Sequence, residues 1–400
     1  MKIFLIYLFI LISCFNPAYC NEVSIVDNCR DARCLSATIS DIATSNDENF
    51  FLVAYKSSDR FIRKINANLS VDSLITFDNS SGENVSFKVL ISSDNNKALI
   101  YSKEINSSLE SIFYILNLQN NTTQKISVNS IKLNALLFFD KTGDSILATN
   151  NDVDDSKLVV VNSMSGEIEK TFSLPDVGDV LALSPTEQDA IVLFKNILFQ
   201  SLDIFDVQKE KLIRIDLPLS IIFKTDEFLE RIKFNENGAK AVLSSLDGIH
   251  VLYFVDLIKN KLIVKKLFEK STGKVLSTVS KDGSFIVSVG LDKEKRNAIL
   301  YKVNAKNIKK LKILQKITLD NIKSVSDILI SPDNENIFIL SENKLLVLKL
   351  SDLSNACEEN LDVSLSNKQF FSNINSLNVF IPSSDDRKIN KVSVSNFCSN

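Results

Sequence analysis

Residues 280–304 read SKDGSFIVSVGLDKEKRNAILYKVN, and this stretch decides the fold. A tight polar turn, Ser280-Lys281-Asp282-Gly283, stands before a short β-branched run from Phe285 to Val289. A polar loop follows, and then a second apolar run from Ile299 to Val303. Short runs rich in Val and Ile and bounded by Gly, Asp, Asn and Ser are typical of β-strands. The stretch therefore predicts two strands joined by a loop.

The same pattern recurs along the whole chain at a mean spacing of about 47 residues. The equivalent polar turns begin at Ser45, Ser93, Asp140, Ser184, Asn235, Ser280, Ser331 and, in a weaker form, Asn373. A more alternating fourth segment, such as Glu169 to Ser173 or Lys211 to Ile215, completes the unit. Four short strands per unit predict an all-β fold, a β-propeller of four-stranded blades, and the β-branched runs exclude helical repeats of similar period.

The chain length sets the number of blades. Eight units of about 47 residues fill residues 21–400, whereas seven would leave about one unit without a place, so eight blades are expected and seven are the alternative. The last unit offers three strand candidates, 370–374, 377–381 and 389–395, and then the chain stops. Residues 22–27 also have strand character. We expect this N-terminal strand to complete the last sheet and close the ring, which hides an open sheet edge.

The N-terminus predicts export. Lys2 is followed by an almost wholly apolar run from Ile3 to Phe15, and Ala18-Tyr19-Cys20 fits a cleavage site. The run is shorter than the roughly 20 residues that a transmembrane helix needs. We therefore expect residues 1–20 to be a signal peptide, residues 21–400 to form one propeller domain, and the protein to be secreted or periplasmic. Alternatively, Leu11-Ile12-Ser13-Cys14 fits a lipobox, which would make a membrane-tethered lipoprotein anchored at Cys14.

Cysteine parity favours the cleaved form, because a cut after Cys20 leaves an even set suited to two disulfides in an oxidising compartment. That set is Cys29, Cys34, Cys357 and Cys398. Cys29 and Cys34 lie between the N-terminal strand and the first blade. Cys357 and Cys398 each follow a predicted third strand of adjacent blades, and therefore lie on the opposite face. We expect Cys29 to pair with Cys34 and Cys357 with Cys398.

Several units carry a family resemblance. Ser331-Pro332-Asp333-Asn334, Ser280-Lys281-Asp282-Gly283 and Leu158 to Asn162 with Ser165-Gly166 resemble the S-P-D-G and Y-V-x-N-x-x-S-G elements of YVTN-type propellers. This wider group includes lactonase-like and WD40-like repeats. The resemblance implies a propeller scaffold and carries no activity with it, because the Trp-Asp dipeptide of WD40 repeats and the Gly-Gly pair of kelch repeats are absent from the sequence.

The loops on the face that carries the connections between blades are the predicted partner-binding site, since propeller sites usually lie at one mouth of the channel. The candidate residues on this face are Arg60, Asp152, Asp154, Asp155, Asp247, His250, Asp292, Asp385, Asp386 and Arg387. His250 is the only histidine, and a structural role is expected for it. The acidic run at 152–155 lacks the spaced acid and glycine pattern of a calcium loop, so no metal site is predicted.

A basic stretch from Lys295 to Leu319 contains no acidic residue. It holds a candidate basic patch of Lys306, Lys309, Lys310 and Lys312. Such a patch in a protein of net charge −3 can dock an anionic surface such as lipid head groups or polysaccharide. Charged outer strands also protect sheet edges from aggregation, and this second interpretation stays open.

These features predict an exported, non-catalytic scaffold that binds a protein or glycan partner through loops on one face. One alternative is a lactonase-like hydrolase with a carboxylate site at the channel mouth, and another is a lipid-anchored assembly subunit. The single His, the absence of Trp and the nine Gly leave little material for metal sites, indole platforms or Gly-rich phosphate loops, so no cofactor is expected. The negative net charge argues against a general nucleic-acid binder.

Overall fold

The computed structural model describes most strands of the chain and the turns on one side of it. It does not describe a set of terminal and loop residues: 1–19, 25–37, 48, 57–60, 67–70, 77–85, 103–110, 130, 132, 134, 139, 141, 151–156, 174–177, 184–190, 197–200, 207–210, 217–231, 245–250, 260, 268–270, 293–296, 308–309, 321, 332, 342–343, 361–377, 383–387 and 394–400. All regular elements in the described part are β-strands.

Seven four-stranded sheets follow one another along the chain, and we number them as blades in sequence order. Blade one is β2 (Thr38–Thr44), β3 (Phe50–Lys56), β4 (Phe61–Asn66) and β5 (Val71–Thr76). Blade two is β6 (Phe87–Ile91), β7 (Lys97–Ser102), β8 (Ser111–Asn117) and β9 (Thr122–Val128). Blade three is β10 (Ala135–Phe138), β11 (Ser145–Asn150), β12 (Lys157–Asn162) and β13 (Ile168–Ser173). Blade four is β14 (Gly178–Leu183), β15 (Ile191–Asn196), β16 (Ser201–Asp206) and β17 (Lys211–Asp216).

The second half of the chain repeats this order. Blade five is β18 (Ile232–Phe234), β19 (Lys240–Leu243), β20 (Val251–Asp256) and β21 (Lys261–Lys266). Blade six is β22 (Ser271–Val279), β23 (Phe285–Asp292), β24 (Ala298–Asn304) and β25 (Lys312–Leu319). Blade seven is β26 (Asp327–Ile330), β27 (Asn336–Leu340), β28 (Lys344–Lys349) and β29 (Asn355–Asn360). The last sheet contains β1 (Cys20–Ser24), β31 (Lys388–Ser393) and β30 (Asn378–Pro382).

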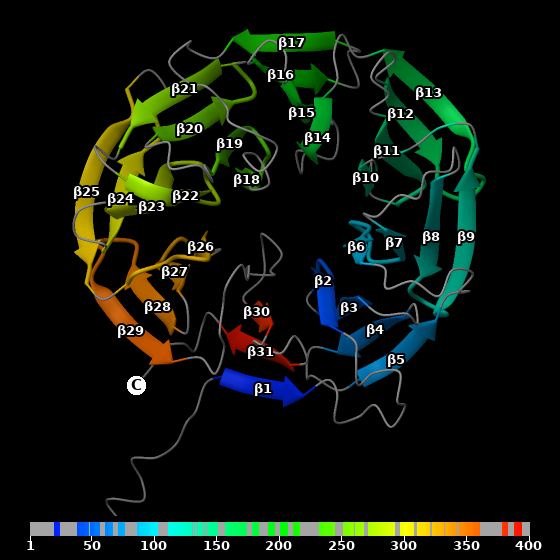
Figure 1. Cartoon of the computed structure of the whole chain (residues 1–400), viewed down its shortest axis with the longest axis horizontal. Helices are drawn as coiled ribbons and strands as arrows, with labels where there is room; N and C mark the ends of the chain where they lie inside the picture. Colours follow the sequence, from blue (N-terminus) through cyan, green and yellow to red (C-terminus); the bar gives the residue numbers. More distant parts are fainter. Residues whose placement is uncertain are drawn as a thin grey trace, which may run out of the picture.

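The sheets are arranged radially in a ring, which is the architecture of a β-propeller (Figure 1). The first strand of each blade lies nearest the centre and the fourth lies at the periphery, as β2 and β5 show. In the seven four-stranded sheets, neighbouring strands pair antiparallel in sequence order. The predicted strands at 285–289 and 299–303 are confirmed within β23 and β24, and those at 169–173 and 211–215 within β13 and β17.

The ends of the chain share one sheet. β1 pairs antiparallel with β31, and Val23 lies opposite Ile389. The predicted N-terminal closing strand is therefore present, as Cys20–Ser24, and residues 25–27 of the prediction lie outside the described residues. The predicted innermost strand at 370–374 lies outside the described residues. Eight sheets are present in the described part of the chain, and the number of complete blades in the closed ring stays a prediction.

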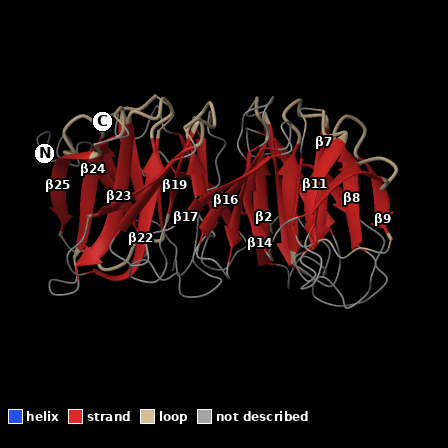
Figure 2. Cartoon of the chain, turned by 90° about the horizontal axis from the view of Figure 1, so that it is seen from above, coloured by secondary structure: helices blue, strands red, loops and turns tan. Residues whose placement is uncertain are grey.

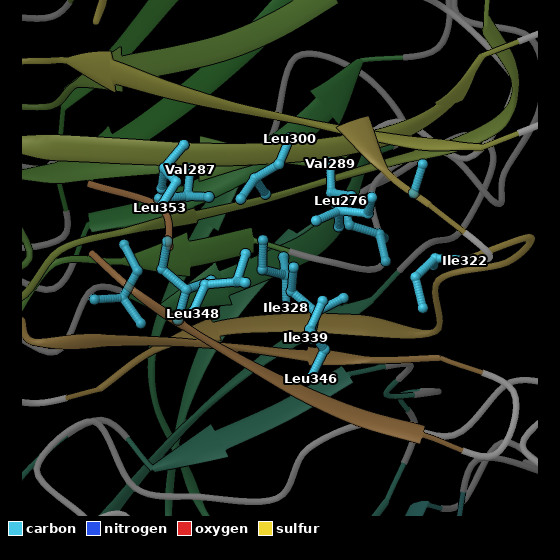
Figure 3. Packing of buried hydrophobic residues seen from close by; sticks show 14 of the residues in the cluster. Leu276, Val287, Val289, Leu300, Ile322, Ile328, Ile339, Leu346, Leu348 and Leu353 are labelled. Carbon is cyan, nitrogen blue, oxygen red and sulfur yellow. The ribbon is translucent and has the colours of Figure 1, made fainter. Parts of the chain in front are cut away.

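The hydrophobic core lies between neighbouring blades. Figure 3 shows the cluster between blades six and seven, where Val287 and Leu300 face Ile339 and Leu348. Similar clusters lie between blades one and two, two and three, and five and six. The middle strands supply most of these side chains, since β11 and β12 each bury four consecutive residues. Both faces of these strands are thus covered by protein.

The repeated polar turn has a physical reason for its sequence. In blade six the Ser280 hydroxyl donates to Asp282 at 2.7 Å and accepts from the Phe285 amide at 2.9 Å. Gly283 then adopts φ +67°, and a Cβ there would lie 2.7 Å from the Lys240 side chain of blade five. Asn334 takes the same left-handed conformation in blade seven. The Ser-x-Asp-Gly or Asn pattern is thus needed to start the second strand.

Truncation of the core tests the dependence of each blade on its neighbours. Leu300 is fully buried in the cluster between blades six and seven. We expect Leu300→Ala to lower the free energy of unfolding by about 2–5 kcal/mol, because it leaves a cavity. Met164 is 49% exposed in the turn before β13, so Met164→Ala should change stability by no more than about 0.5 kcal/mol. Urea unfolding measures both, and equal effects would contradict this assignment of the core.

Candidate binding face and the contacts that support it

The strand order gives the ring two different faces. One, which we call the turn face, carries the connections between first and second strands and between third and fourth strands. The other, the loop face, carries the connections between second and third strands and between blades. Figure 2 shows the described loops gathered on one side of the ring.

The predicted partner-binding residues belong to the loop face, and most lie outside the described residues. These are Arg60, Asp152, Asp154, Asp155, Asp247, His250, Asp385, Asp386 and Arg387. Only Asp292 of this set is described. The polar loop expected directly after Val289 begins later, because β23 continues to Asp292, which pairs with Ser271 of β22. The Asp292 amide donates to the Asn297 carbonyl at 2.9 Å and so holds the end of the strand.

The turn face is joined from blade to blade by hydrogen bonds. Between blades one and two, the Asn46 amide donates to Asn95 Oδ1 at 2.8 Å and the Asn46 side chain donates to the Ser93 carbonyl at 2.7 Å. Between blades six and seven, the Lys281 amide donates to Asn334 Oδ1 at 3.1 Å. Polar turns of neighbouring blades are therefore fixed to each other.

Four lysines also join neighbouring blades through hydrogen bonds. Each donates its ammonium group to a main-chain carbonyl of the next blade: Lys64 to Leu118 at 3.1 Å, Lys240 to Gly283 at 2.8 Å, Lys302 to Ser351 at 2.9 Å and to Leu350, and Lys265 to Leu311. Burial lowers the pKa of Lys240 and Lys302. Lys302 belongs to the basic stretch of the sequence, but its charge is directed into the interface between blades six and seven.

A buried carboxylate joins the inner strands of blades one and two. Asp41 of β2 accepts from the Val89 amide at 3.0 Å and lies 3.3 Å from Lys88 Nζ, both on β6. Burial raises the pKa of Asp41, against the opposing effects of the Lys88 charge and the Val89 amide. Both carboxylate oxygens have partners on the next blade. Asp41 therefore fastens blade two to blade one, and its position inside an ordinary strand pattern left no signal in the sequence.

The candidate basic patch lies where the turn face meets the outer edge of blade six. Lys306, Lys310 and Lys312 are exposed, and Lys309 lies outside the described residues. Lys306 Nζ lies 5.9 Å from the centre of the Phe285 ring. Lys312 begins the outer strand β25, and Lys306 and Lys310 precede that strand.

The predicted disulfides fall mostly outside the described residues, which include neither Cys29, Cys34 nor Cys398. Cys357 is disulfide-bonded. It lies within the outer strand β29, opposite Val347, and not in the loop before that strand. The two pairings stay predictions.

In the described part of the chain, no three His, Cys, Asp or Glu side chains come together in a way that would hold a metal ion. Within the same residues, no helix has the length and apolar character needed to span a membrane.

The comparison with known proteins shows the fold. No family model matches the chain, and no curated protein matches its sequence. A structure of hydrazine synthase from Kuenenia stuttgartiensis superposes with a TM-score of 0.51 at 9% identity, covering 89% of this chain and 95% of the other. The Dos1 propeller superposes with a TM-score of 0.60 at 11% identity, covering 90% and 92%. The predicted β-propeller is confirmed, while the finer YVTN and WD40-like resemblance stays a prediction.

The direction of the Asp41 pKa shift predicts a pH dependence. A raised pKa in the folded protein means that the Asp41 contribution to stability is greatest below its ordinary pKa of 3.8 and declines as the pH rises through the folded value. Asp41→Asn removes this titration. From pH 4 to pH 7, the unfolding free energy of the wild type should therefore fall relative to that of Asp41→Asn.

A matched control uses Asp352, whose pKa is lowered by the Ser354 amide. Any stability that Asp352 contributes is lost only as the pH falls below 3.8. From pH 4 to pH 7, the difference in unfolding free energy between Asp352→Asn and the wild type should therefore stay constant. Urea unfolding at several pH values measures all three proteins. A wild type that gains stability relative to Asp41→Asn as the pH rises would refute the assignment.

Proposed function

We propose that this chain is an exported β-propeller scaffold that binds a protein or glycan partner through its loop face and has no catalytic role. One observation carries the proposal: connection lengths differ between the two faces. Connections on the turn face are short and uniform, as at 45–49, 92–96, 280–284 and 331–335. On the loop face they range from 341–343 to 217–231. Variable loops on a rigid ring are a common basis for recognition.

Charged side chains between blades, two buried and one half-buried, support a structural use of the ring. Asp41, Lys240 and Lys302 all make their polar contacts with the next blade. Paired in this way, they hold neighbouring sheets in register. A ring fastened on its turn face keeps the loops of the other face at constant separations, which favours contact with a large partner at several points.

Export rests on the N-terminal apolar run, and the structure adds a consequence. A cut after Cys20 removes the first residue of β1 and leaves Asn21 to Ser24 for pairing with β31. An anchor at Cys14 would instead keep all of β1, and would place the membrane close to the last sheet. The proposed location of the protein is therefore secreted or periplasmic, with Cys29–Cys34 and Cys357–Cys398 disulfides.

The mass of the mature N-terminus tests export directly. We expect a chain that begins at an unmodified Asn21, because the apolar run ends in a cleavage site and the remaining cysteines are even in number. Mass spectrometry of protein purified from its natural host gives the answer. An acylated Cys14 would contradict this expectation and would show that the protein is a lipid-anchored lipoprotein.

Charge removal on each face tests partner binding. The loop-face variant Asp292→Asn, Asp385→Asn, Asp386→Asn should lower the amount of crosslinked partner recovered with the full chain about tenfold, since polar contacts at a buried interface centre contribute about 1–2 kcal/mol. The turn-face control Glu167→Gln, Glu335→Gln, Asp352→Asn changes three carboxylates as well and should retain the partner.

Quantitative mass spectrometry compares the two variants with the wild type. Equal recovery from the loop-face variant and the wild type would refute the proposed face. Both variants are also assayed with lactone and ester substrates. If the wild type turns over one of these substrates and the loop-face variant does not, the protein is a hydrolase and the scaffold proposal is wrong.

A further inference from the structure

A β-bulge recurs between the third and fourth strands of four blades. In each blade one residue of the outer strand is skipped in the pairing, and these residues are Asp72, Glu169, Leu314 and Ala356. A bulge turns its extra side chain away from the regular ladder. The four positions are therefore equivalent sites on the outer rim of the ring, and their side chains can be compared directly.

Blades one and three use this position for a carboxylate that binds a group of its own blade. Asp72 lies 3.5 Å from Lys64 Nζ, and Glu169 accepts from the Asn162 side chain at 3.0 Å. Lys302 in blade six occupies the register position of Lys64, since each precedes the bulge on the third strand. Its bulge residue, however, is Leu314. Blade six thus keeps the lysine and replaces the carboxylate with an aliphatic side chain.

The surroundings of Leu314 combine positive charge with exposed apolar surface. Leu314 is 40% exposed and its neighbour Ile313 is 37% exposed. Lys310, Lys312 and Lys316 are exposed beside them along β25 and its preceding turn, and Lys306 is exposed in the same turn. The stretch from Lys295 to Leu319 contains no acidic residue. We call Lys306, Lys310, Lys312, Lys316, Ile313 and Leu314 the basic rim.

We infer that the basic rim binds the surface of an anionic lipid bilayer. Lysines next to a bilayer are attracted by its negative surface potential, and adjacent aliphatic side chains enter the boundary between head groups and acyl chains. A soluble polyanion such as an acidic polysaccharide would use the ammonium groups and leave Ile313 and Leu314 without a role. The combination of both kinds of side chain therefore favours lipid.

The inference is independent of the proposed partner on the loop face. The basic rim lies on the outer edge of blade six, next to the turn face. Lys265 and Lys302 lie close to it, but their ammonium groups bind carbonyls of the next blade. We therefore do not include these two lysines in the lipid-binding surface. A bilayer held at this edge leaves the loop face free to bind its partner.

Vesicle sedimentation with the full mature chain tests the inference. We expect binding to vesicles of phosphatidylcholine mixed with phosphatidylglycerol, weakening with added salt, and little binding to vesicles of phosphatidylcholine alone. Lys310→Gln with Lys312→Gln should lower the partition coefficient about thirtyfold, since each lysine near an anionic surface contributes about 1 kcal/mol. The control Lys125→Gln with Lys170→Gln removes two exposed lysines from the outer strands of blades two and three and should bind like the wild type.

Leu314→Asp tests the contribution of the bulge residue to vesicle binding. It installs at the bulge of blade six the residue that blade one carries at Asp72, so the fold has a precedent for it. We expect it to reduce vesicle binding more than Leu314→Ser, since it adds a negative charge as well as removing apolar surface. Urea unfolding confirms that each variant is folded.

Three results would overturn the inference. The first is equal binding to neutral and anionic vesicles, and the second is anionic vesicle binding unchanged by the Lys310 and Lys312 substitutions. The third is binding to dextran sulfate without binding to any vesicle, which would assign the basic rim to a soluble polyanion. Failure of partner capture on the loop face leaves these results unaffected, so the two proposals are tested separately.

Discussion

Burial between blades is the constraint on which the rest of this structure depends. The middle strands are apolar on both faces, as the consecutive buried residues of β11 and β12 show. A single sheet of this kind would expose one or both faces to water, with an unfavourable free energy of about 25 cal/mol for each Å² of apolar surface. Neighbouring sheets on both sides remove that exposure, so each blade is stable only as a member of the ring.

The polar groups that lie between blades follow from the same constraint. A charge or amide placed between two apolar sheets needs a partner there, because an unpaired buried polar group is strongly destabilising. Asp41 binds the amide of Val89 and the ammonium of Lys88, and Lys302 binds the carbonyls of Leu350 and Ser351, directly after β28. Apolar packing between blades is not directional, and these hydrogen bonds and ion pairs fix the position of one sheet relative to the next. The ring is thereby a fixed frame for its loops.

Repetition of one unit also makes departures from it informative. Four blades share the same bulge, and the backbone there is set by the pairing of the third and fourth strands. The residue at the bulge has no pairing partner on the third strand, so the ladder does not fix its side chain. Asp72 and Glu169 bind groups of their own blades, whereas Leu314 contributes to an exposed surface among lysines. The bulge of the outer strand is thus a position at which side chains of different chemistry occur in different blades.

Sequence reasoning predicted the strands and turns well, because both depend on neighbours along the chain. Phe285 to Val289 is a strand in any context that buries it, and Ser280 to Gly283 forms a turn from its own hydroxyl, carboxylate and glycine. The extent of β23 was underestimated, since Gly290 and Asp292 are poor strand formers that pairing with β22 overrides. Of the candidate residues on the loop face, Asp292 alone lies in the described part of the chain.

The sequence by itself determined the class of fold, the repeat and the division of polar and apolar segments, because these are properties of residues close together in the chain. Only the tertiary structure decided which charges serve the fold and which face solvent. Lys302, Lys310 and Lys312 read alike in a basic run, yet Lys302 binds the next blade and the other two are exposed. The reason is that the Lys302 partners, Leu350 and Ser351, lie on the next blade, at a distance along the chain that no local pattern records.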